Sequence, residues 1–398
     1  MKILIMGAGL QGSVCASILA RDDFADEILL ADYDYSLVER VMAKIKSDKI
    51  KGFQVDATKV DDVAVLAEEC DVVMDFVLPW MATYVMKAAL KAKAHYVNTA
   101  YDTPYWEQLT QGKELELNQA FKDAGLTAIL GCGSMPGYLN VCIAKYANKL
   151  DSIENILMRN GFGITIPVPR LGEWDPGWSP KQALIDFLTE PTIFENGEYK
   201  KMPIFSGEED FVFEGPIGEN YIAYHSHEEA YSLPYSYKDK GIQNCSFRYP
   251  VDEQAATYIF QGFVPDNEVE VNGVKVKPFD VLMQMVAQPG EVFFEEEAPT
   301  EEEGVACCET HVDIDGTENG KKVSYRISVP FLPKNQIKTY AVCGTTSVGI
   351  SLPAVTGAKM CAEGAPTGVI FAEQLNPDRF IEIINEKLDF KPRVVYKK

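Results

Sequence analysis

The 398-residue chain is long enough for two or three domains, because globular domains contain about 150 residues each. Hydrophobic residues make up 46% and charged residues 24%, which excludes a fibrous protein and a chain without a packed core. The 37 Lys and Arg residues against 59 Asp and Glu residues give a net charge of −22. So acidic a surface repels phosphate backbones, and we therefore expect no nucleic-acid partner.

The N-terminus and the cysteines indicate a cytoplasmic protein. Met1 and Lys2 lead directly into an apolar run and leave no room for a secretory signal. No apolar run approaches the roughly 20 residues that span a bilayer, so we expect no membrane association. The nine cysteines are scattered without a C-x-x-C pair, a pattern typical of reduced thiols.

A glycine-rich turn follows the first predicted strand. Residues 2–6 form the strand, residues 7–12 (GAGLQG) fit G-x-G-x-x-G, and residues 13–20 show helical spacing. The first glycine permits a tight turn, the second lets the backbone approach a pyrophosphate, and the third lets helix and strand pack closely. The phosphates would lie at the helix N-terminus. The residues predicted to bind them are Gly7, Gly9, Leu10, Gln11 and Gly12.

An acidic residue ends the second predicted strand. This strand covers residues 27–31, and Asp32 lies 20 residues beyond Gly12. A carboxylate at this place accepts hydrogen bonds from the adenosine ribose hydroxyls and repels a 2′-phosphate. No arginine follows Asp32 closely. We therefore expect NAD as the cofactor rather than NADP.

Strand-like and helix-like runs alternate as far as residue 130. We expect strands at 52–55, 71–76, 94–99 and 127–130, and helices at 60–69, 81–93 and 105–124. This series predicts a doubly wound, parallel Rossmann sheet. Ligands bind such sheets beyond the carboxyl ends of the strands. The residues placed there are Asp56 for the adenine, Phe76, Val77, Leu78 and Thr99 for the cofactor, and Tyr101, Asp102 and Gly133 for the substrate.

These segments resemble the saccharopine dehydrogenase family. Beside the glycine turn, the resemblance rests on residues 76–79 (FVLP), 97–101 (VNTAY) and 131–137 (GCGSMPG), where the family has loops like LIP, TTSY and GxDPG. It continues through residues 161–163, 178–180, 223–224, 232–234 and 344–377, and so spans nearly the whole chain. The resemblance implies an NAD(P)-dependent oxidoreductase that acts at a carbon–nitrogen bond. The family includes saccharopine reductases, lysine 6-dehydrogenases and carboxynorspermidine dehydrogenases.

One position departs from the family pattern. Saccharopine-forming members have an Asp before the Pro-Gly pair, positioned for the substrate amine, whereas this chain has Met135. A thioether cannot pair with an ammonium, which disfavours saccharopine chemistry. Lysine 6-dehydrogenases also tend to lack that acid, and residues 178–207 look more like theirs. The resemblance therefore favours a lysine 6-dehydrogenase-like enzyme, with an opine-, saccharopine- or carboxynorspermidine-type imine reductase as the alternative.

From residue 151 the pattern changes to separate strands joined by loops that contain glycine and proline. We expect strands at 153–158, 220–224, 242–249, 257–263 and 323–331, and few helices. These predict an inserted α+β domain built on a mostly antiparallel sheet. Asn376-Pro377 has the form of an N-cap followed by proline at the first helical position. The predicted domains are 1–130 (Rossmann), 131–344 (substrate binding and dimerisation) and 345–398, a segment that in the family returns to the first domain.

The expected chemistry requires an acid/base group. An amine must be neutral to lose hydride, since an ammonium has no lone pair to stabilise the forming iminium, and histidine titrates near the working pH. If residues 225–229 form a strand, then His225, His227 and Glu229 share one face. This cluster has three open interpretations: exposed polar residues at a sheet edge, a substrate-contacting acid/base site, or a metal site. We assign it as the acid/base site, without a metal.

Other candidates have alternatives as well. Tyr101 could orient the substrate or form an aromatic wall, and Asp102 could hold a cationic amine or cap the next helix. Arg159 or Arg170 could clamp a substrate carboxylate. Thr345 and Thr346 could line the pocket, His95 is predicted to be structural, and His311 has no assigned role. Cys132 and Cys142 are predicted to be packing residues.

The sequence thus predicts a cytoplasmic, homodimeric, NAD-dependent dehydrogenase of a small amino acid or amine. The alternative is a protein of another functional class, a scaffold that binds NAD without catalysing a reaction.

Overall fold

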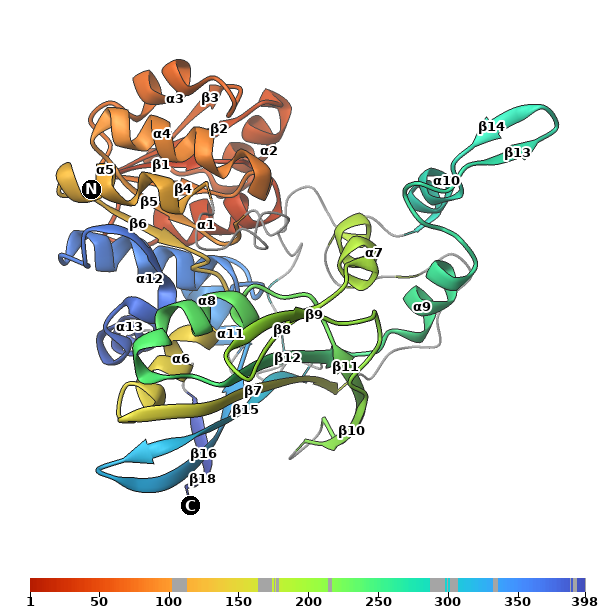
Figure 1. Cartoon of the computed structure of the whole chain (residues 1–398). Coiled ribbons are helices and arrows are strands. Elements are labelled where there is room, and N and C mark those ends of the chain that lie inside the picture. Colours follow the sequence, from red (N-terminus) through yellow and green to blue (C-terminus); the bar gives the residue numbers. More distant parts are fainter. Residues whose placement is uncertain are drawn as a thin grey trace.

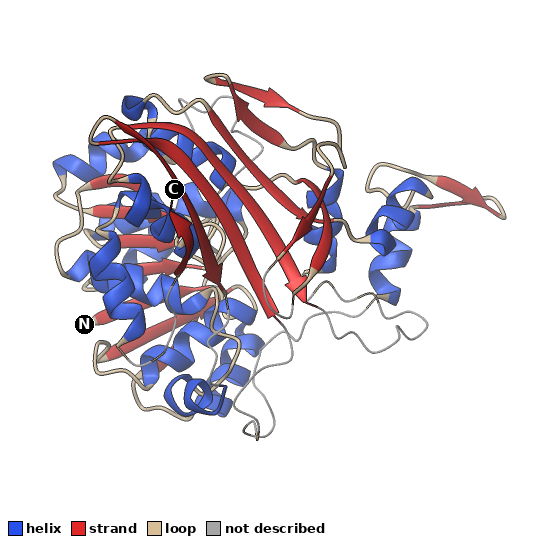
Figure 2. Ribbon diagram, turned by 90° about the horizontal axis from the view of Figure 1, so that it is seen from below, coloured by secondary structure: helices blue, strands red, loops and turns tan. Residues whose placement is uncertain are grey.

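The computed structural model describes most of the chain, which Figure 1 traces from one terminus to the other. The described residues are 1–101, 113–163, 174, 176, 179–213, 217–286, 298, 300, 307–331, 336–386, 388 and 392–397. Two large sheets, one parallel and one mainly antiparallel, lie beside each other with helices around them (Figure 2). Among the described residues, no helix has both the length and the apolar character needed to cross a bilayer.

The first sheet has seven parallel strands in the order β17-β6-β5-β4-β1-β2-β3, which confirms the predicted doubly wound sheet. Its strands are β1 (Lys2–Met6), β2 (Glu27–Asp32), β3 (Ile50–Gln54), β4 (Val72–Asp75), β5 (His95–Asn98), β6 (Thr127–Leu130) and β17 (Gly368–Phe371). The helices of this half are α1 (Leu10–Ala20), α2 (Tyr35–Ile45), α3 (Val60–Ala67), α4 (Ala82–Ala92), α5 (Asn118–Asp123), α11 (Gln336–Cys343), α12 (Ser351–Ala362) and α13 (Pro377–Asn385). Of the helix expected at 105–124, residues 105–112 lie outside the described part of the chain.

Both faces of this sheet are covered by helices. Side chains alternate across a strand, so Ile3 and Ile5 join the core with α1 and α12, whereas Leu4 and Met6 join the core with α3 and α4. Two-sided burial explains why these strands are almost continuously apolar. The predicted cap of the last helix is confirmed, because the Asn376 side chain accepts hydrogen bonds from the backbone of Asp378 and Arg379.

The second sheet has nine strands, with the main order β10-β11-β12-β7-β15-β16-β18. Its strands are β7 (Ser152–Gly163), β8 (Thr192–Glu195), β9 (Glu198–Lys201), β10 (Glu209–Val212), β11 (Glu219–Tyr224), β12 (Asn244–Pro250), β15 (Cys307–Glu318), β16 (Lys321–Pro330) and β18 (Arg393–Lys397). The β12–β7 pair is parallel and the other pairs are antiparallel, so the expectation of a mostly antiparallel sheet is confirmed.

One expected strand is a helix instead. Residues 257–263 lie mainly in α9 (Glu253–Phe260). The carboxylate of Asp252 accepts hydrogen bonds from the backbone of Gln254 and Ala255, and this N-cap overrides the strand propensity of the residues that follow. The middle of the chain also contains α7 (Pro180–Leu188), α8 (Glu229–Ser236) and α10 (Pro278–Met285), more helix than expected. Beyond α9, a hairpin of β13 (Val269–Val271) and β14 (Val274–Val276) projects from the body (Figure 1).

Helix α6 (Tyr138–Ala147) joins the two halves. It begins just after the carboxyl end of β6, and its Leu139 and Ile143 belong to the same core as Ile156 and Met158 of β7. One face of the second sheet, here termed the inner face, therefore packs on α6. Helix α6 starts at the carboxyl ends of the parallel strands, where ligands are expected. The part of the inner face that packs near the start of α6 therefore lies close to these strand ends.

Lys240 caps the C-terminal end of α6, and we expect this cap to contribute to the stability of the fold. The ammonium of Lys240 donates hydrogen bonds to the carbonyl oxygens of Ala147, Asn148 and Leu150 at 2.7–3.0 Å. Lys240→Met keeps the apolar stem but removes these bonds, and we expect urea denaturation to show a free energy of unfolding lower by about 1–2 kcal/mol. The exposed Lys238→Met is the control, and an equal loss in both variants would contradict the capping role.

Candidate active site

The glycine turn has the shape that a dinucleotide requires. Gly7 has a φ of +97°, and its N–H donates to the carbonyl of Ala31 at 2.8 Å. A Cβ on Gly12 would lie 1.8 Å from the carbonyl oxygen of Gly7, so only glycine fits there, whereas a Cβ on Gly9 would meet no atom within 4 Å. The turn is thus closely packed at Gly12 and open at Gly9, a geometry that fits the pyrophosphate of a dinucleotide.

The acidic residue after β2 contacts this turn. One oxygen of Asp32 accepts the N–H of Ala8 at 2.7 Å, and the other accepts the N–H of Asp34 at 2.8 Å. The carboxylate is thereby fixed beside the open side of the turn. Gln11 contacts the C-terminal part of the chain, since the hydroxyl of Ser351 donates to its side-chain oxygen at 3.0 Å. Asp56 instead accepts two hydrogen bonds from Thr58, which lower the pKa of its carboxyl.

The predicted cofactor residues after β4 and β5 lie at the same sheet edge. A Cβ on Gly7 would come within 3.0 Å of the carbonyl oxygen of Phe76, so the loop of residues 76–78 borders the glycine turn. Leu78 is exposed. Thr99 lies against Gly133, because a Cβ added to Gly133 would lie 3.2 Å from the Cβ of Thr99.

A buried chain of hydrogen bonds, which the sequence did not reveal, aligns these strand ends. The Tyr96 hydroxyl donates to Asp75 at 2.7 Å, and the Asn98 amide donates to the Tyr96 oxygen at 3.1 Å and accepts the N–H of Gly131 at 2.8 Å. Burial raises the pKa of Asp75 to about 6, against the effect of these hydrogen bonds. The chain links β4, β5 and the loop after β6, and so fixes the edge at which the nicotinamide is expected.

The histidine cluster is not on a strand, which corrects the expected alternation. Strand β11 ends at Tyr224, residues 225–228 turn, and α8 begins at Glu229. The turn nevertheless brings the predicted side chains together, since His227 contacts the Glu229 carboxylate and the His225 and His227 ring centroids are 6.2 Å apart. The turn also directs Glu228 inward, with its carboxylate 3.8 Å from His227 Nδ1.

Aromatic rings on the inner face support both histidines. His227 stacks on Phe247 of β12 with centroids 4.2 Å apart, and His225 stacks on Tyr249 at 4.9 Å. Phe187 of α7 contacts the edge of His225. Asp186, also on α7, lines a small cavity together with His225 and Tyr249. The sequence analysis did not identify Asp186 or Glu228, because neither is part of a recognisable spacing.

Burial and charge separate the pKa values of this cluster. Burial lowers the pKa of His225 to about 3. Burial alone would also lower the pKa of His227, but the carboxylates of Glu229, Glu228 and Asp186 raise it to about 9. Burial raises the pKa of Glu228 to about 7 and that of Asp186 to about 6. Three carboxyl groups therefore act on one imidazolium, with Glu229 buried and Glu228 and Asp186 partly buried.

The carboxylate of Glu229 is incompletely paired. Its side chain is fully buried, and one oxygen contacts His227, whereas the other has no hydrogen-bond partner. Ligand atoms of His227, Glu228 and Glu229 also lie within 4.8 Å of one another, so the geometry admits a divalent cation as well as an amine.

Tyr101 and Glu373 connect this cluster to the first sheet. Tyr101, just beyond β5, is buried, packs on Phe371, and donates from its hydroxyl to the Glu228 carbonyl at 3.4 Å. Glu373 follows β17 and is buried. Its carboxylate accepts hydrogen bonds from Asn140 of α6 at 3.1 Å and Ser236 of α8 at 2.9 Å. The start of α8 therefore lies near the carboxyl end of β5.

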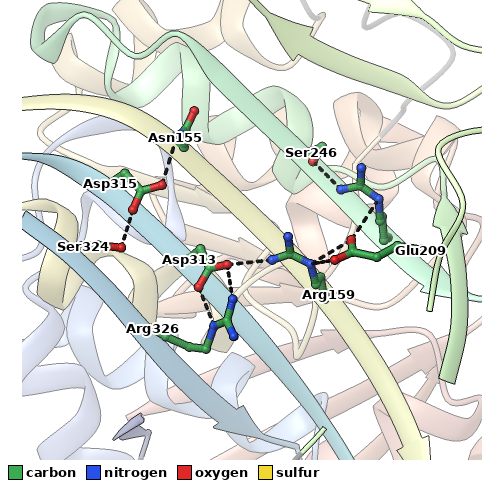
Figure 3. A network of polar contacts seen from close by, with 9 residues as sticks. Asn155, Arg159, Glu209, Ser246, Asp313, Asp315, Ser324 and Arg326 are labelled. Atoms are coloured by element: carbon green, nitrogen blue, oxygen red, sulfur yellow. Dashed lines mark hydrogen bonds and ion pairs between the residues drawn. The ribbon is translucent and has the colours of Figure 1, made fainter. Parts of the chain in front are cut away.

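Arg159 lies apart from the cluster. It points to the outer face of the second sheet, where it donates to Glu209 at 2.9 Å and to Asp313 at 2.9 Å (Figure 3). Arg326 also pairs with Asp313. The guanidinium is therefore engaged by two carboxylates in a structural network. Of the other substrate candidates, Asp102 and Arg170 lie outside the described residues, and Thr345 is buried and accepts the N–H of Ser347 at 3.2 Å.

The remaining histidines and cysteines have structural surroundings. His95 accepts the N–H of Thr127 at 3.0 Å through Nδ1, as expected for a structural residue. His311 is buried beside Glu309 and two phenylalanine rings on the outer face. Burial raises the pKa of the Cys132 and Cys142 thiols, consistent with packing residues.

The cluster predicts an unusual pair of histidine titrations. NMR of histidine-labelled protein should show His227 titrating near pH 9, whereas His225 stays neutral from roughly pH 5 to 9. Because the pKa of His227 is raised above 6.5, its pairing stabilises the fold fully below pH 6.5, and this contribution is lost as the pH rises through about 9. Glu229→Gln should lower the pKa of His227. Two ordinary titrations near pH 6.5 would contradict the described geometry.

Comparison with known proteins agrees with this geometry. Residues 3–129 match the family model for the saccharopine dehydrogenase NADP binding domain. The chain is 27% identical over 411 residues to a carboxyaminopropylagmatine dehydrogenase from Synechocystis sp., covering 97% of this chain and 95% of the relative. It is 28% identical over 416 residues to a carboxynorspermidine synthase from Vibrio cholerae, covering 96% and 94%.

Two solved structures share the fold. Apo saccharopine dehydrogenase (L-Glu forming) from Saccharomyces cerevisiae matches with a TM-score of 0.67 and 14% identity, covering 99% of this chain and 100% of that chain. Homospermidine synthase from Legionella pneumophila in complex with NAD matches with a TM-score of 0.69 and 14% identity, covering 99% and 91%. The resemblance to the saccharopine dehydrogenase family seen in the sequence is thereby confirmed: residues 3–129 match the family's NADP binding domain, and the chain as a whole shares the fold of these two structures.

Proposed function

We propose that this protein reduces an imine to a secondary amine, or oxidises that amine to the imine, by hydride transfer at the carbon of the C–N bond. The secondary amine joins a cationic amine to a chain that carries a carboxylate. The observation that carries the proposal is the excess of carboxylates around His227, of which Glu229 is buried and Asp186 and Glu228 are partly buried. Asp186, Glu228 and Glu229 face one imidazolium, and a cationic ligand would supply the missing positive charge. The names of the two relatives support an amine of this kind.

The names of the relatives favour the alternative given in the sequence analysis, a carboxynorspermidine-type imine reductase, over a lysine 6-dehydrogenase-like enzyme. The name carboxyaminopropylagmatine describes agmatine that carries a carboxyaminopropyl group. Such a bond forms when an amine condenses with an aldehyde and the imine is reduced. A nicotinamide cofactor would supply or accept the hydride. The protein must therefore bind the amine, hold the imine beside the strand ends, and move one proton on the nitrogen.

The cluster offers groups for each of these tasks. Glu228, with a pKa of about 7, is suited to exchange a proton with the amine nitrogen near neutral pH. The unpaired oxygen of Glu229 and the carboxylate of Asp186 would hold the cationic part of the substrate. Tyr101 would bring this group to the edge where the nicotinamide is expected. His227 keeps Glu229 ionised, and the neutral His225 would form part of the wall.

Asp32 beside the glycine turn supports NAD as the preferred cofactor. A carboxylate there accepts hydrogen bonds from a ribose diol and repels a 2′-phosphate. The homodimer and the cytoplasmic location stay predictions from the sequence.

Replacing Glu228 tests the proposed acid/base role. With reduced nicotinamide cofactor, agmatine or 1,3-diaminopropane, and 2-amino-4-oxobutanoate, the native protein should oxidise the cofactor. We expect Glu228→Gln to lower kcat roughly 100-fold or more and to remove the limb of the pH profile near 7. The exposed Glu154→Gln serves as the control.

Two further outcomes decide between the classes of function. The cofactor could bind while no turnover occurs with these pairs, with lysine or with other diamines. This result would favour a non-catalytic NAD-binding scaffold. Loss of turnover on dialysis against a chelator, restored by a divalent cation, would replace the amine site by a metal site.

The choice of cofactor can be tested at Asp32. Asp32→Ala should weaken NAD binding about 10-fold and NADP binding less, so that calorimetry shows a loss of the preference for NAD. Asp34→Ala is the matched control, since Asp34 caps α2 through the backbone of Ser36 and should affect stability alone. An unchanged ratio of the two affinities in Asp32→Ala would refute the ribose contact.

A further inference from the structure

Asn160 is the inner-face neighbour of Arg159. Successive side chains on a strand point to opposite faces, so Arg159 joins the outer network while Asn160 joins the face that carries Met158. Asn160 is fully buried, and its amide nitrogen has no hydrogen-bond partner. A buried amide donor without a partner costs free energy, and a bound ligand that accepts a hydrogen bond is one way in which that cost is offset.

The carbonyl oxygen of this amide faces β15. The hydroxyl of Thr310, directly opposite Asn160 across the strand pair, donates to the Asn160 oxygen at 2.9 Å. The Cys308 thiol approaches the same oxygen at 3.7 Å. The carbonyl side of the amide is therefore satisfied within the protein, and the two N–H groups remain for another acceptor.

The neighbours of Asn160 belong to the candidate active site. The Thr310 hydroxyl also lies 3.5 Å from the sulfur of Met135, in the loop that follows β6 at the ligand-binding edge. On the other side, Tyr249 of the adjacent strand stacks on His225. The free donor thus lies between the strand-end loop and the acidic cluster.

We propose that the Asn160 amide is a specificity-determining donor that binds the substrate carboxylate, an inference that rests on the proposed function. An ammonium cannot accept a hydrogen bond, so the donor must face an acceptor oxygen, and the acidic cluster is left for the cationic part. The substrate would then lie across the inner face, with its carboxylate at β7 and its amine near α8. Arg159, one residue earlier in the chain, takes no part.

A matched pair of ligands isolates the carboxylate. The probes are 2,4-diaminobutyrate and 1,3-diaminopropane, which differ by the carboxylate alone, titrated calorimetrically into NAD-saturated protein. The preference for the carboxylated probe over the diamine should fall about 10-fold or more in Asn160→Leu, since one hydrogen bond to a charged group is lost. Asn155→Leu, on the outer face of the same strand, should keep the native ratio.

A second readout separates binding from structure. 2,4-Diaminobutyrate should raise the melting temperature of the native protein more than 1,3-diaminopropane does, and this difference should disappear in Asn160→Leu, whereas a purely structural role predicts a lower melting temperature with the difference retained. Should Asn160→Leu not fold, Asn160→Asp, which keeps the bond to Thr310, must show the same loss of preference.

Several outcomes would overturn the inference. These are a native ratio in Asn160→Leu, no binding of 2,4-diaminobutyrate to the native protein, or weaker NAD binding with an unchanged ratio, which would assign the donor to the cofactor. Redox turnover is assayed separately. Its absence together with an Asn160-dependent preference would refute the proposed function and leave the carboxylate contact intact.

Discussion

The position of the candidate site depends on the buried carboxylate of Glu373. It receives hydrogen bonds from Asn140 on α6 and Ser236 on α8, and so joins both helices to the end of β17. Together with the Tyr101 hydroxyl, which donates to the Glu228 carbonyl, this link holds the turn that carries His227, Glu228 and Glu229 in a fixed relation to the nucleotide-binding sheet. Burial raises the pKa of Glu373, which weakens its tendency to ionise, and its hydrogen bonds act in the opposite direction. A polar group at the junction of two apolar layers thus determines where the chemistry can occur.

The site combines several features that oppose stability. The carboxylates near His227 repel one another, one oxygen of the buried Glu229 has no partner, and neither has the amide nitrogen of Asn160. Each group costs free energy in the free protein and gains a partner when a ligand carries the opposite charge or an acceptor. The two kinds of group differ in what they require, since the carboxylates require a cation and the amide requires an acceptor oxygen. A zwitterionic amine satisfies both.

Much of the first sheet could be predicted from the sequence, because two-sided burial makes its strands continuously apolar and the glycine spacing has a single physical explanation. The cluster at residues 225–229 was found for an incorrect reason. A strand was assumed there, and the assumed alternation placed Glu228 on the wrong side, whereas a turn before α8 brings it to His227. Arg159 was a candidate for binding a substrate carboxylate, but in β7 it points to the outer face and its neighbour Asn160 points to the inner face. Which side chains of a half-buried strand face the core is decided by its pairing with strands far away in the sequence. Local sequence patterns do not contain that information.

Both sheets are completed by the last part of the chain. Strand β17 pairs with β6 at one edge of the parallel sheet, and β18 pairs with β16 at one edge of the other. During synthesis on the ribosome, β6 and β16 therefore each lack one strand partner until β17 and β18 emerge, and β17 and β18 then become the sheet edges. Unpaired edges are templates for intermolecular pairing, so this topology makes the interval between translation of β6 and release of the chain its period of greatest exposure to aggregation.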